Sequence, residues 1–407
     1  MDSGAPVQDA GADTGSRPPD LPSPCEYTTD RVEFDDQGSD VLGYDLTRID
    51  AGAALAWTAK DLDAGGWSMD LGFYDDALVA TRPAVRVLET DKILTDPRML
   101  WTGEAMMILW RDGRWDTGCT DPAACRTDLA LARLSPDGGM AGIERLTTDR
   151  KAVEKPLLMD TGDGFLAVWM QQEGNDPTLG RLYAMPLDRQ GVMSGSRMLL
   201  SGSGDVVKGS PSAAWGAQGG LVGWAENGSN TIMLEAVDAN AAAVGSPARV
   251  DTGGKVFRLS LQSQGPGSFL LAWSQVLEGT LDATEVFVAA VGPSGLLSEP
   301  IRQSWTNGRA THPALMRLPS GWGLFWVSDT AQGKTDCLDP ACTTDVYLTI
   351  LDATGAPLTR PRLVTDDRND CDDGRGISTG DGIVAAWTAV RYFRSSLFGR
   401  RLSCKMP

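Results

Sequence analysis

The sequence predicts an all-β protein, a seven-bladed β-propeller, and two observations support this prediction. A phrase made of a Gly-containing turn, a short apolar run and a Trp recurs seven times along the 407 residues, at intervals of roughly 50–60 residues. The segments between the copies alternate apolar and polar residues, which is typical of antiparallel strands, and no segment has a helical period. Four strands in each of seven repeats predict four-stranded antiparallel blades around a central axis.

The repeated phrase is clearest in two copies, GDGFLAVW ending at Trp169 and GDGIVAAW ending at Trp387. Its Gly-Asp-Gly supplies the positive φ of a tight hairpin turn, and its Trp lies on the second strand of the blade. All seven copies end in such a residue: Trp57, Trp110, Trp169, Trp224, Trp273, Trp326 and Trp387. An aromatic cage is the alternative role, but the constant place after an apolar run favours large wedges between adjacent blades.

The other strands of each repeat follow the Trp in a fixed order. A polar loop leads to third strands such as LALARL, RLYAMPL, IMLEAV, VFVAAV and VYLTIL. Tight turns follow, for instance SPDGGM and DRQGVM, and short fourth strands such as RMLL and RLVTD close the unit. Each repeat therefore has the four strands that a blade requires.

The two ends of the chain predict how the ring closes. The seventh repeat lacks an outer strand, while the segment TTDRVEFDD at 28–36 is a strand without a repeat of its own. We expect this N-terminal strand to complete the last blade. Cys25 and Cys404 flank the place where a turn would otherwise join the two strands, so a Cys25–Cys404 disulfide would replace that turn.

The remaining cysteines suggest local pairs. Cys119–Cys125 (CTDPAAC) and Cys337–Cys342 (CLDPAC) each enclose a short loop with an Asp-Pro turn, which leaves Cys371 over. Six paired cysteines imply an oxidising compartment. Zinc is the rival interpretation, but isolated cysteine pairs and a single histidine do not make an ordinary zinc site. We therefore predict three disulfides and no bound metal at these cysteines.

Residues 1–24, MDSGAPVQDAGADTGSRPPDLPSP, are small, acidic and Pro-rich, and they predict a disordered tether in front of a single propeller domain at 25–407. The spacer behind the lipidated Cys of a mature bacterial lipoprotein has the same character. We expect that a signal peptide and an anchor Cys preceded this tether and that Met1 stands in their place; an ordinary disordered N-terminus is the alternative. No run of about 18 apolar residues occurs, so we predict no transmembrane helix.

The blade phrase and the Gly/Asp/Ala-rich spacer together resemble the secreted and lipid-anchored β-propeller proteins of myxobacteria and related bacteria. The resemblance covers residues 25–407 and rests on structural motifs. It implies a propeller fold and an extracytoplasmic location, either secreted or at the outer membrane, and it implies no catalytic residues. WD-repeat propellers share the blade plan, but their Gly-His and Trp-Asp dipeptides do not recur here.

The formal net charge of −18 argues against nucleic acid and anionic membranes as partners, because both select a basic face. Nevertheless, a basic residue precedes the first strand of five repeats at a near-constant distance from the blade Trp: Lys92, Lys151, Lys208, Lys255 and Arg309. Near the central opening these side chains would form a cationic ring for a carboxylate, phosphate or sulfated sugar. The alternative is that each Lys pairs with a nearby carboxylate, such as Asp91 or Asp205, in a solvated loop.

In a propeller, the loops between strands two and three share one face with the connections between blades, and here these loops are long and dissimilar. We expect protein or glycan partners at this loop-rich face. Five aromatic residues outside the repeat positions are candidates for such contacts: Trp67, Trp115, Trp305, Tyr392 and Phe393. Packing beneath the long loops is the alternative role for these residues.

Two further features invite a chemical interpretation. The acidic segment DDRNDCDDG at 366–374 offers the carboxylates that calcium prefers, but its spacing does not match a D-x-[DN]-x-[DN]-G loop, and a solvated acidic loop is the alternative. We expect no other cofactor. His312, at the start of an inner strand, is expected to be a packed or channel-lining residue rather than a base.

These observations favour a non-enzymatic binding or scaffold module over an enzyme. A propeller glycoside hydrolase or lyase acting on a polysaccharide is the alternative, and a hydrolase would need two carboxylates flanking the central pocket. The sialidase-type S-x-D turn occurs once, as SPDGG at 135–139, and lacks the Trp that follows in those enzymes. A structural component of a cell-envelope surface complex is a third alternative. No residue is assigned a catalytic role.

Overall fold

The computed structural model describes residues 21–22, 25–35, 39–119, 121, 125–149, 151–172, 180–202, 210–226, 229–280, 283–305, 308–329, 344–365, 370–380, 382–391 and 394–404. Several sequence predictions fall outside these ranges: the tether at 1–24 apart from Leu21 and Pro22, Lys208, Cys337, Cys342, Tyr392 and Phe393. Pro22 lies against blade six, because its carbonyl oxygen accepts a hydrogen bond of 3.2 Å from the Arg360 amide.

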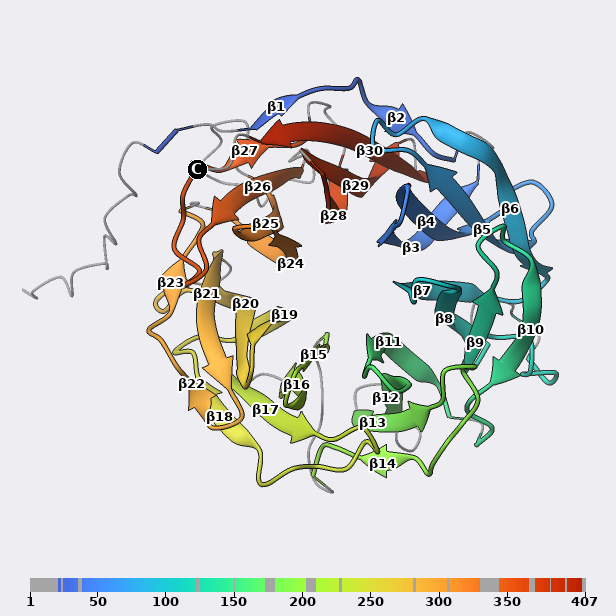
Figure 1. The fold of residues 1–407 in the computed structure, drawn as a ribbon, viewed down its shortest axis with the longest axis horizontal. Coiled ribbons are helices and arrows are strands. Elements are labelled where there is room, and N and C mark those ends of the chain that lie inside the picture. The colour runs from blue at the N-terminus through green and yellow to red at the C-terminus, as the bar shows by residue number, and fades with distance from the viewer. Residues whose placement is uncertain are drawn as a thin grey trace, which may run out of the picture.

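The described residues form seven antiparallel sheets arranged as a ring around a central opening (Figure 1). In each sheet the first strand lies innermost, beside the opening, and the last lies at the periphery. The described part of the chain contains strands and turns but no helix. The described residues therefore include no helix that could span a membrane. The predicted all-β, seven-bladed propeller is confirmed.

The strands of each blade are given from the inner to the outer one. Blade one has β3 (Asp40–Ile49), β4 (Gly52–Lys60), β5 (Trp67–Tyr74) and β6 (Ala80–Thr90), and blade two has β7 (Leu94–Trp101), β8 (Met106–Asp112), β9 (Asp128–Leu134) and β10 (Met140–Arg145). Blade three has β11 (Val153–Asp160), β12 (Phe165–Gln172), β13 (Gly180–Leu187) and β14 (Met198–Leu199), and blade four has β15 (Ser212–Gly216), β16 (Gly219–Ala225), β17 (Thr231–Val237) and β18 (Ala248–Asp251). Blades five and six are β19 (Val256–Gly265), β20 (Ser268–Val276), β21 (Thr284–Gly292) and the short outer strands β22 (Gly295–Leu296) and β23 (Ile301–Arg302); β24 (Ala310–Leu318), β25 (Gly321–Ser328), β26 (Asp345–Leu351) and β27 (Arg362–Leu363).

The seventh blade is completed by the N-terminal segment, as predicted. Its strands are β28 (Asp370–Thr379), β29 (Gly382–Arg391) and β30 (Arg394–Cys404), with β1 (Cys25–Tyr27) and β2 (Val32–Glu33) on the outer edge of β30. The predicted single strand at 28–36 is wrong in its bounds, because the edge strand begins at Cys25 and is interrupted after Tyr27. Cys25 pairs directly with Cys404, and the predicted disulfide joins the two residues with their Cα atoms 4.0 Å apart.

The second predicted disulfide, Cys119–Cys125, is also present, with the Cα atoms 5.4 Å apart. It closes the loop between β8 and β9. Cys371, which the predicted pairing leaves over, is buried on β28 in the core between blades six and seven.

The hydrophobic core is divided into seven clusters, and each fills the interface between two neighbouring blades. Each cluster contains one Trp of the repeated phrase. In the interface between blades two and three, Trp169 of β12 is fully buried together with Leu109 of β8 and Leu131 of β9. Each repeat Trp therefore packs its own blade against the preceding one, which is the wedge that the repeated phrase predicts.

The Gly-Asp-Gly turn has a steric reason in the same blade. Gly162 has a φ of 90°, a value that residues with a side chain rarely adopt. A Cβ on Gly164 would collide with the carbonyl oxygen of Leu187, at the end of the neighbouring strand β13. The turn thus allows β12 to begin directly beside β13, and it lets the apolar run reach Trp169 in the correct register.

Candidate functional site

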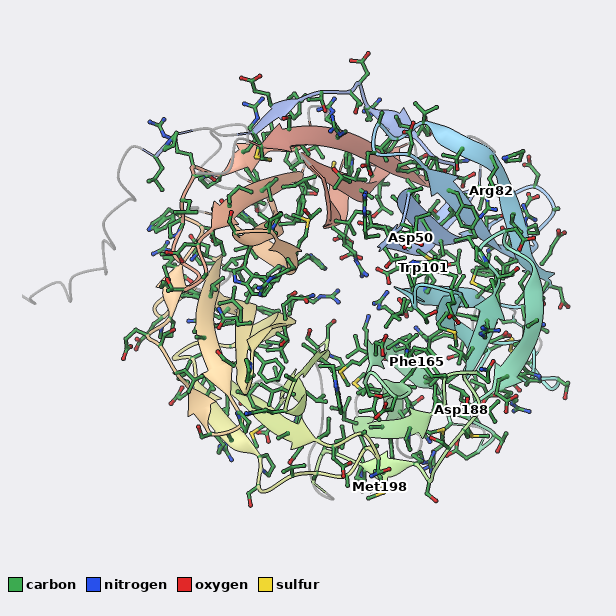
Figure 2. The ribbon with its side chains drawn as sticks, viewed as in Figure 1. Asp50, Arg82, Trp101, Phe165, Asp188 and Met198 are labelled. Atoms are coloured by element: carbon green, nitrogen blue, oxygen red, sulfur yellow. A yellow bond between two sulfur atoms is a disulfide. The ribbon has the colours of Figure 1, made fainter. Side chains whose placement is uncertain are left out.

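The inner strands enclose a central cavity of about 950 Å³. Side chains from β3, β7, β11, β19, β24 and β28 line it, together with Ser210 and Pro211 ahead of β15, so all seven blades contribute. The hairpin ends of two inner strands also meet near the opening, where the Trp101 indole donates a hydrogen bond of 3.1 Å to Asp50 (Figure 2). Outer-strand residues such as Arg82 and Met198 lie at the periphery of the ring (Figure 2).

A bulge near the start of the inner strand positions the polar side chains of the cavity. The register of the inner strand shifts against the second strand at Val41/Gly43, Thr95/Arg98, Glu154/Leu157, Val256/Arg258, Thr311/Ala314 and Asp372/Arg375. Four bulge residues have a positive φ, namely Asp96 (54°), Lys155 (50°), His312 (53°) and Asp373 (49°), and all four line the cavity. A side chain in this backbone conformation costs about 1–3 kcal/mol, and bulges re-aim side chains beside functional sites.

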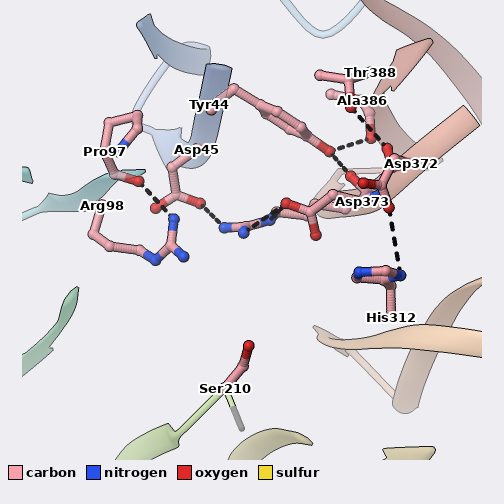
Figure 3. A network of polar contacts seen from close by, with 12 residues as sticks. Tyr44, Asp45, Pro97, Arg98, Ser210, His312, Asp372, Asp373, Ala386 and Thr388 are labelled. Carbon is pink, nitrogen blue, oxygen red and sulfur yellow. Dashed lines mark hydrogen bonds and ion pairs between the residues drawn. The ribbon is translucent and has the colours of Figure 1, made fainter. Parts of the chain in front are cut away.

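Arg375 is the centre of a polar network that joins blade seven to blade one, and Figure 3 shows its partners Asp45 and Asp373. Its guanidinium lies 2.9 Å from Asp45 of β3 and 2.9 Å from Asp373 of its own strand. The hydroxyl of Tyr44, also on β3, donates to the backbone carbonyls of Asp373 and Ala386. Asp45 in turn accepts a hydrogen bond of 2.8 Å from the backbone amide of Met99 on β7. These contacts close the ring on its inner side, where the Cys25–Cys404 disulfide cannot act.

The network changes the acidity of its members. Burial alone would raise the pKa of Asp373, but Arg375 and other nearby cations outweigh it and hold the pKa at about 2. Burial would likewise lower the pKa of Arg375, yet Asp373 and Asp45 raise it. Burial raises the pKa of the Tyr44 hydroxyl well above its usual value. In the folded protein, Asp373 and Arg375 are therefore charged at neutral pH.

We expect acid to weaken the fold through Asp373. Its folded pKa of about 2 lies below its ordinary value of 3.8, so its contribution to stability is complete above that ordinary value and is lost as the pH falls towards 2. The free energy of unfolding of the Asp373→Asn variant should therefore decrease less than that of the unchanged protein between about pH 4 and pH 2. Urea titrations across this range measure the difference; parallel curves for the two proteins would contradict the assignment.

Three further cationic side chains line the cavity and form no salt bridge with a described carboxylate: Arg98, Lys155 and Arg258. Burial and Arg375 lower the pKa of Arg98, against the opposing effect of Asp45 and Asp96. The Arg98 guanidinium is directed towards the cavity in Figure 3 and donates only to the carbonyl of Pro97, at 2.7 Å. Arg258 donates to the hydroxyl of Ser210, and Lys155 has no hydrogen bond to a described residue. Burial, Arg258 and other cations lower the pKa of Lys155. The three side chains are half-buried and come from blades two, three and five.

The nearby carboxylate of Asp96 forms its salt bridge, of 2.9 Å, with Arg111 of β8 and acts on Arg98 and Lys155 only through space. Burial alone would raise the pKa of Asp96, but Arg111, Arg98 and Lys155 lower it. Among the carboxylates that line the cavity, Asp45 and Asp373 are paired with Arg375, Asp96 with Arg111, and Asp372 faces His312, so Arg98, Lys155 and Arg258 are left without a salt bridge to a described residue.

His312 lies between these two regions. Its Nδ1 is 3.4 Å from a carboxylate oxygen of Asp372 on the neighbouring blade (Figure 3). Burial lowers the pKa of His312, and the cations Arg258 and Lys155 lower it further, against the opposing effect of Asp372. Since it lines the cavity, the sequence-based expectation of a channel-lining His312 agrees with its position.

The basic residues expected to form a cationic ring do not include the cations that line the cavity. Among its described members, none of Lys92, Lys151, Lys255 and Arg309 lines the cavity. The Lys92 ammonium donates to the Cys119 carbonyl at 3.0 Å, and the Lys255 ammonium lies 5.3 Å above the Phe257 ring. Lys155 and Arg258, which lie a few residues further along the chain than Lys151 and Lys255, line the cavity instead of them. Ligand binding by the predicted residues Lys92, Lys151, Lys208, Lys255 and Arg309 stays a prediction.

The described aromatic candidates, Trp67, Trp115 and Trp305, differ in how far they are buried. The prediction that Trp67 is an exposed loop residue is wrong: it begins β5 and is 4% exposed in the core between blades one and two. Trp115 packs partly against the same core, beneath the guanidinium groups of Arg114 and Arg145. Trp305 is half-buried, with the Arg302 guanidinium 5.9 Å from its ring. Trp67 is therefore a core residue, and Trp115 fits the alternative role of packing beneath a long loop.

The segment proposed for calcium is partly described. Residues 370–374 belong to β28 and its bulge rather than to a loop, and their side chains are engaged: Asp373 binds Arg375 and Asp372 faces His312. Within the described ranges, three metal-ligating groups come together only at Asp116 with Cys119 and Cys125, and these two cysteines form a disulfide. Residues 366–369 of the segment lie outside the described residues, so calcium binding there stays a prediction.

A sequence signal for the cavity residues does exist. Asp96, Lys155, Ser210 and His312 each precede a Pro, at the same distance before the blade Trp in four different repeats. A Pro in an inner strand cannot donate to a sheet, so it is found at bulges. Comparison of the repeats for X-Pro dipeptides would have placed the bulges, and with them the cavity side chains.

No protein-family model matches this chain, and no curated protein matches it either. Among solved structures, an α-L-arabinofuranosidase of Fusarium graminearum is 14% identical, with a TM-score of 0.43, 63% of this chain covered and 78% of that one. An α-L-arabinanase of Penicillium chrysogenum is 16% identical, with a TM-score of 0.46 and the same coverages. A sialidase of Trypanosoma rangeli is 10% identical, with a TM-score of 0.43, 81% of this chain covered and 57% of that one. The assignment of a seven-bladed β-propeller rests on the strand pairing of the chain itself.

Proposed function

We propose that the protein binds an acidic saccharide, a glycan whose sugars carry carboxylate groups, in its central cavity. The observation that supports this most directly is the group of Arg98, Lys155 and Arg258, three half-buried cations without a carboxylate partner among the described residues. A protein with a net charge of −18 has many carboxylates that could pair with them, yet the group is left open.

The chemistry of this group suits a carboxylate. Half-buried cations lose hydration, and an anionic ligand restores the lost interaction through charge-assisted hydrogen bonds. Arginine can bind a carboxylate with two parallel hydrogen bonds, and lysine adds a point charge. A cavity of about 950 Å³ lies within the range of pockets that hold small ligands, so it has room for a short oligosaccharide segment.

The rest of the lining supports a sugar rather than a compact inorganic anion. Asp372, Asp373 and Asp45 would repel a ligand of high charge density, but their oxygens can accept hydrogen bonds from hydroxyl groups. Hydroxyl and amide side chains such as Ser378 and Gln262 also line the cavity. The cations thus fit a negative charge and the carboxylates fit hydroxyl groups, which together describe an acidic sugar.

We expect Lys155→Ala and Arg258→Ala to weaken the binding of uronate oligosaccharides. Loss of a hydrogen bond to a charged group costs about 1.5–3 kcal/mol, which corresponds to roughly 10- to 100-fold in Kd. Isothermal titration calorimetry with galacturonate and mannuronate oligosaccharides, and with neutral oligosaccharides of equal length, measures this. Binding of the acidic sugars should also weaken with added salt.

Arg249→Ala is the matched control, because Arg249 is an exposed cation on the outer strand β18 and its removal changes the net charge equally. The Kd of the Arg249→Ala variant for uronate oligosaccharides should stay within about twofold of the Kd of the unchanged protein. Equal binding of acidic and neutral sugars, or equal losses in all three variants, would contradict an anion site in the cavity.

An enzymatic function on an acidic polysaccharide is the second candidate, and His312 in the cavity favours it. A hydrolase needs a carboxylic acid with a raised pKa as its proton donor. The pKa values of Asp96 and Asp373 are both lowered, which makes them unsuited to that role. A catalytic function would therefore use the histidine rather than these two carboxyls.

We also propose that the protein acts outside the cytoplasm, as a secreted or lipid-anchored protein with its loop-rich face open to a protein or glycan partner. Two disulfides among the described residues support an oxidising compartment. Mass spectrometry of protein isolated from its natural cells, with thiols blocked at lysis, tests this: a reduced Cys25–Cys404 pair would contradict it.

A further inference from the structure

We infer that the cavity cleaves its acidic saccharide by β-elimination, with His312 as the base that removes the proton next to the sugar carboxylate. This inference rests on the proposed function, because the carboxylate must first be held by the cationic group formed by Arg98, Lys155 and Arg258.

The position of His312 supports a base directed at the cavity. Its bulge, with a φ of 53°, places the imidazole on the channel wall, and only 20% of the side chain is exposed. The Nδ1 atom is buried and forms no hydrogen bond with a described residue; the nearest carboxylate oxygen, of Asp372, lies 3.4 Å away. A carboxylate beside Nδ1 favours the tautomer with its proton on that nitrogen. The lone pair of Nε2, which forms no hydrogen bond with a described residue, is then available to a ligand in the cavity.

The electrostatic surroundings keep this imidazole neutral. Burial lowers the pKa of His312, and with Arg258 and Lys155 it outweighs the opposing effect of Asp372 and Asp373. A neutral imidazole can accept a proton at neutral pH, whereas an imidazolium cannot. The two cations that act on His312 through space are also members of the anion-binding group, so the base and the bound carboxylate would lie within reach of each other's charge.

The cations have a second effect on the ligand. The hydrogen on the carbon beside a carboxylate is a weak acid, because its removal adds negative charge to a group that is already charged. Arg98, Lys155 and Arg258 would neutralise the carboxylate and stabilise the charge that develops on its oxygens. The arrangement of a base and an electrophilic group on either side of one carbon is what proton abstraction next to a carbonyl requires.

The reaction balances without another reactant. The proton on the α carbon moves to Nε2 of His312, and the electron pair of that C–H bond forms a double bond between the α and β carbons. The bond from the β carbon to the glycosidic oxygen breaks, and this oxygen leaves with the bonding pair and takes a proton from water. His312 returns its proton to the solvent. One chain becomes two, and the new non-reducing end is an unsaturated uronate.

To test for elimination, the full-length protein is incubated with polygalacturonate and with alginate. The same polymers after chemical reduction of their carboxyl groups serve as controls. Unsaturated uronates absorb in the ultraviolet, and mass spectrometry shows that their new ends lack one water relative to hydrolysed ends. We expect unsaturated products from at least one acidic polymer and none from the reduced polymers. Saturated products, or no cleavage of any acidic polymer that calorimetry shows to be bound, would overturn the elimination.

The variant His312→Gln identifies the base. Removal of a general base lowers the rate by roughly 10²- to 10⁴-fold, while Kd for a uronate oligosaccharide should stay within about threefold. Arg258→Gln should weaken binding and lower the rate together, and Arg249→Ala should change neither. Unchanged turnover in a folded His312→Gln protein would overturn the assignment of His312. If this variant does not fold, hydrolysed ends from the unchanged protein still exclude elimination, and unchanged turnover after complete diethyl pyrocarbonate modification of His312, the one histidine of the chain, would overturn its assignment.

The outcomes separate the two proposals. A protein that binds no acidic saccharide at all overturns the proposed function and the elimination with it. A protein that binds uronates through Lys155 and Arg258 but yields no unsaturated product keeps the binding function and loses only the catalytic inference.

Discussion

Replacement of Trp169 by Ala lowers the free energy of unfolding by about 3–5 kcal/mol, the range found when a large aromatic residue is removed from a protein core. Trp169 is fully buried between blades two and three, its ring stacks on Tyr183 with centroids 6.0 Å apart, and its indole donates a hydrogen bond of 3.3 Å to Gln171. Removal of the indole leaves a cavity in the interface between blades two and three, and both blades lose packing contacts there. Denaturant titration followed by circular dichroism measures the loss.

A propeller has no core other than these interfaces, so the position of the Trp matters more than its chemical type. Trp305→Ala is the matched control, because this residue is half-buried outside the seven interface clusters. Its loss should cost less than about 2 kcal/mol, in proportion to the apolar area that it buries. A similar loss of stability in Trp169→Ala and Trp305→Ala would show that the position of a Trp between blades does not increase its contribution to stability.

The double variant Cys25→Ser, Cys404→Ser should lose about 2–5 kcal/mol of stability. The disulfide spans a sequence separation of 379 residues, so it removes much of the conformational freedom that the unfolded chain would otherwise have. It also holds the short strand β1, of three residues, on the last blade. Equilibrium unfolding under non-reducing conditions gives the difference between the variant and the unchanged protein.

The Cys119–Cys125 disulfide provides the comparison, because its sequence separation is 6 residues. On the same chain-entropy argument, Cys119→Ser, Cys125→Ser should cost roughly 2 kcal/mol. If the two double variants lose the same stability, the long disulfide does not act by closing the ring. Limited proteolysis adds a local measurement, since loss of the Cys25–Cys404 link should expose residues 25–35 before any other part of the propeller.

The sequence predicts more of the fold than of the cavity. Every Trp of the repeated phrase lies on the second strand of a blade and packs against the preceding blade. The closing Cys25–Cys404 pair is also where the sequence places it. These features depend on signals within one repeat or at one chain end, namely apolar alternation, turn residues and missing partners.

The cavity residues were predicted with less success for a geometric reason. The basic residues Lys151 and Lys255 and the wall residues Lys155 and Arg258 lie close together in sequence, but a bulge lies at or before the wall positions. One extra residue in a strand reverses the face to which the following side chains point. A basic residue near the start of an inner strand therefore indicates that cations are present near the channel, but not which of them reach it.

The sequence by itself determined the number of blades, the wedges between them and the closure of the ring, because each follows from local patterns repeated along the chain. Only the tertiary structure decided which charges meet in the centre. Arg375 and Asp45 are 330 residues apart and bind each other because the ring returns blade seven to blade one. His312 reaches Asp372 of the next blade, and it shares one cavity with Lys155 and Arg258, because bulges direct side chains from separate blades to a common axis.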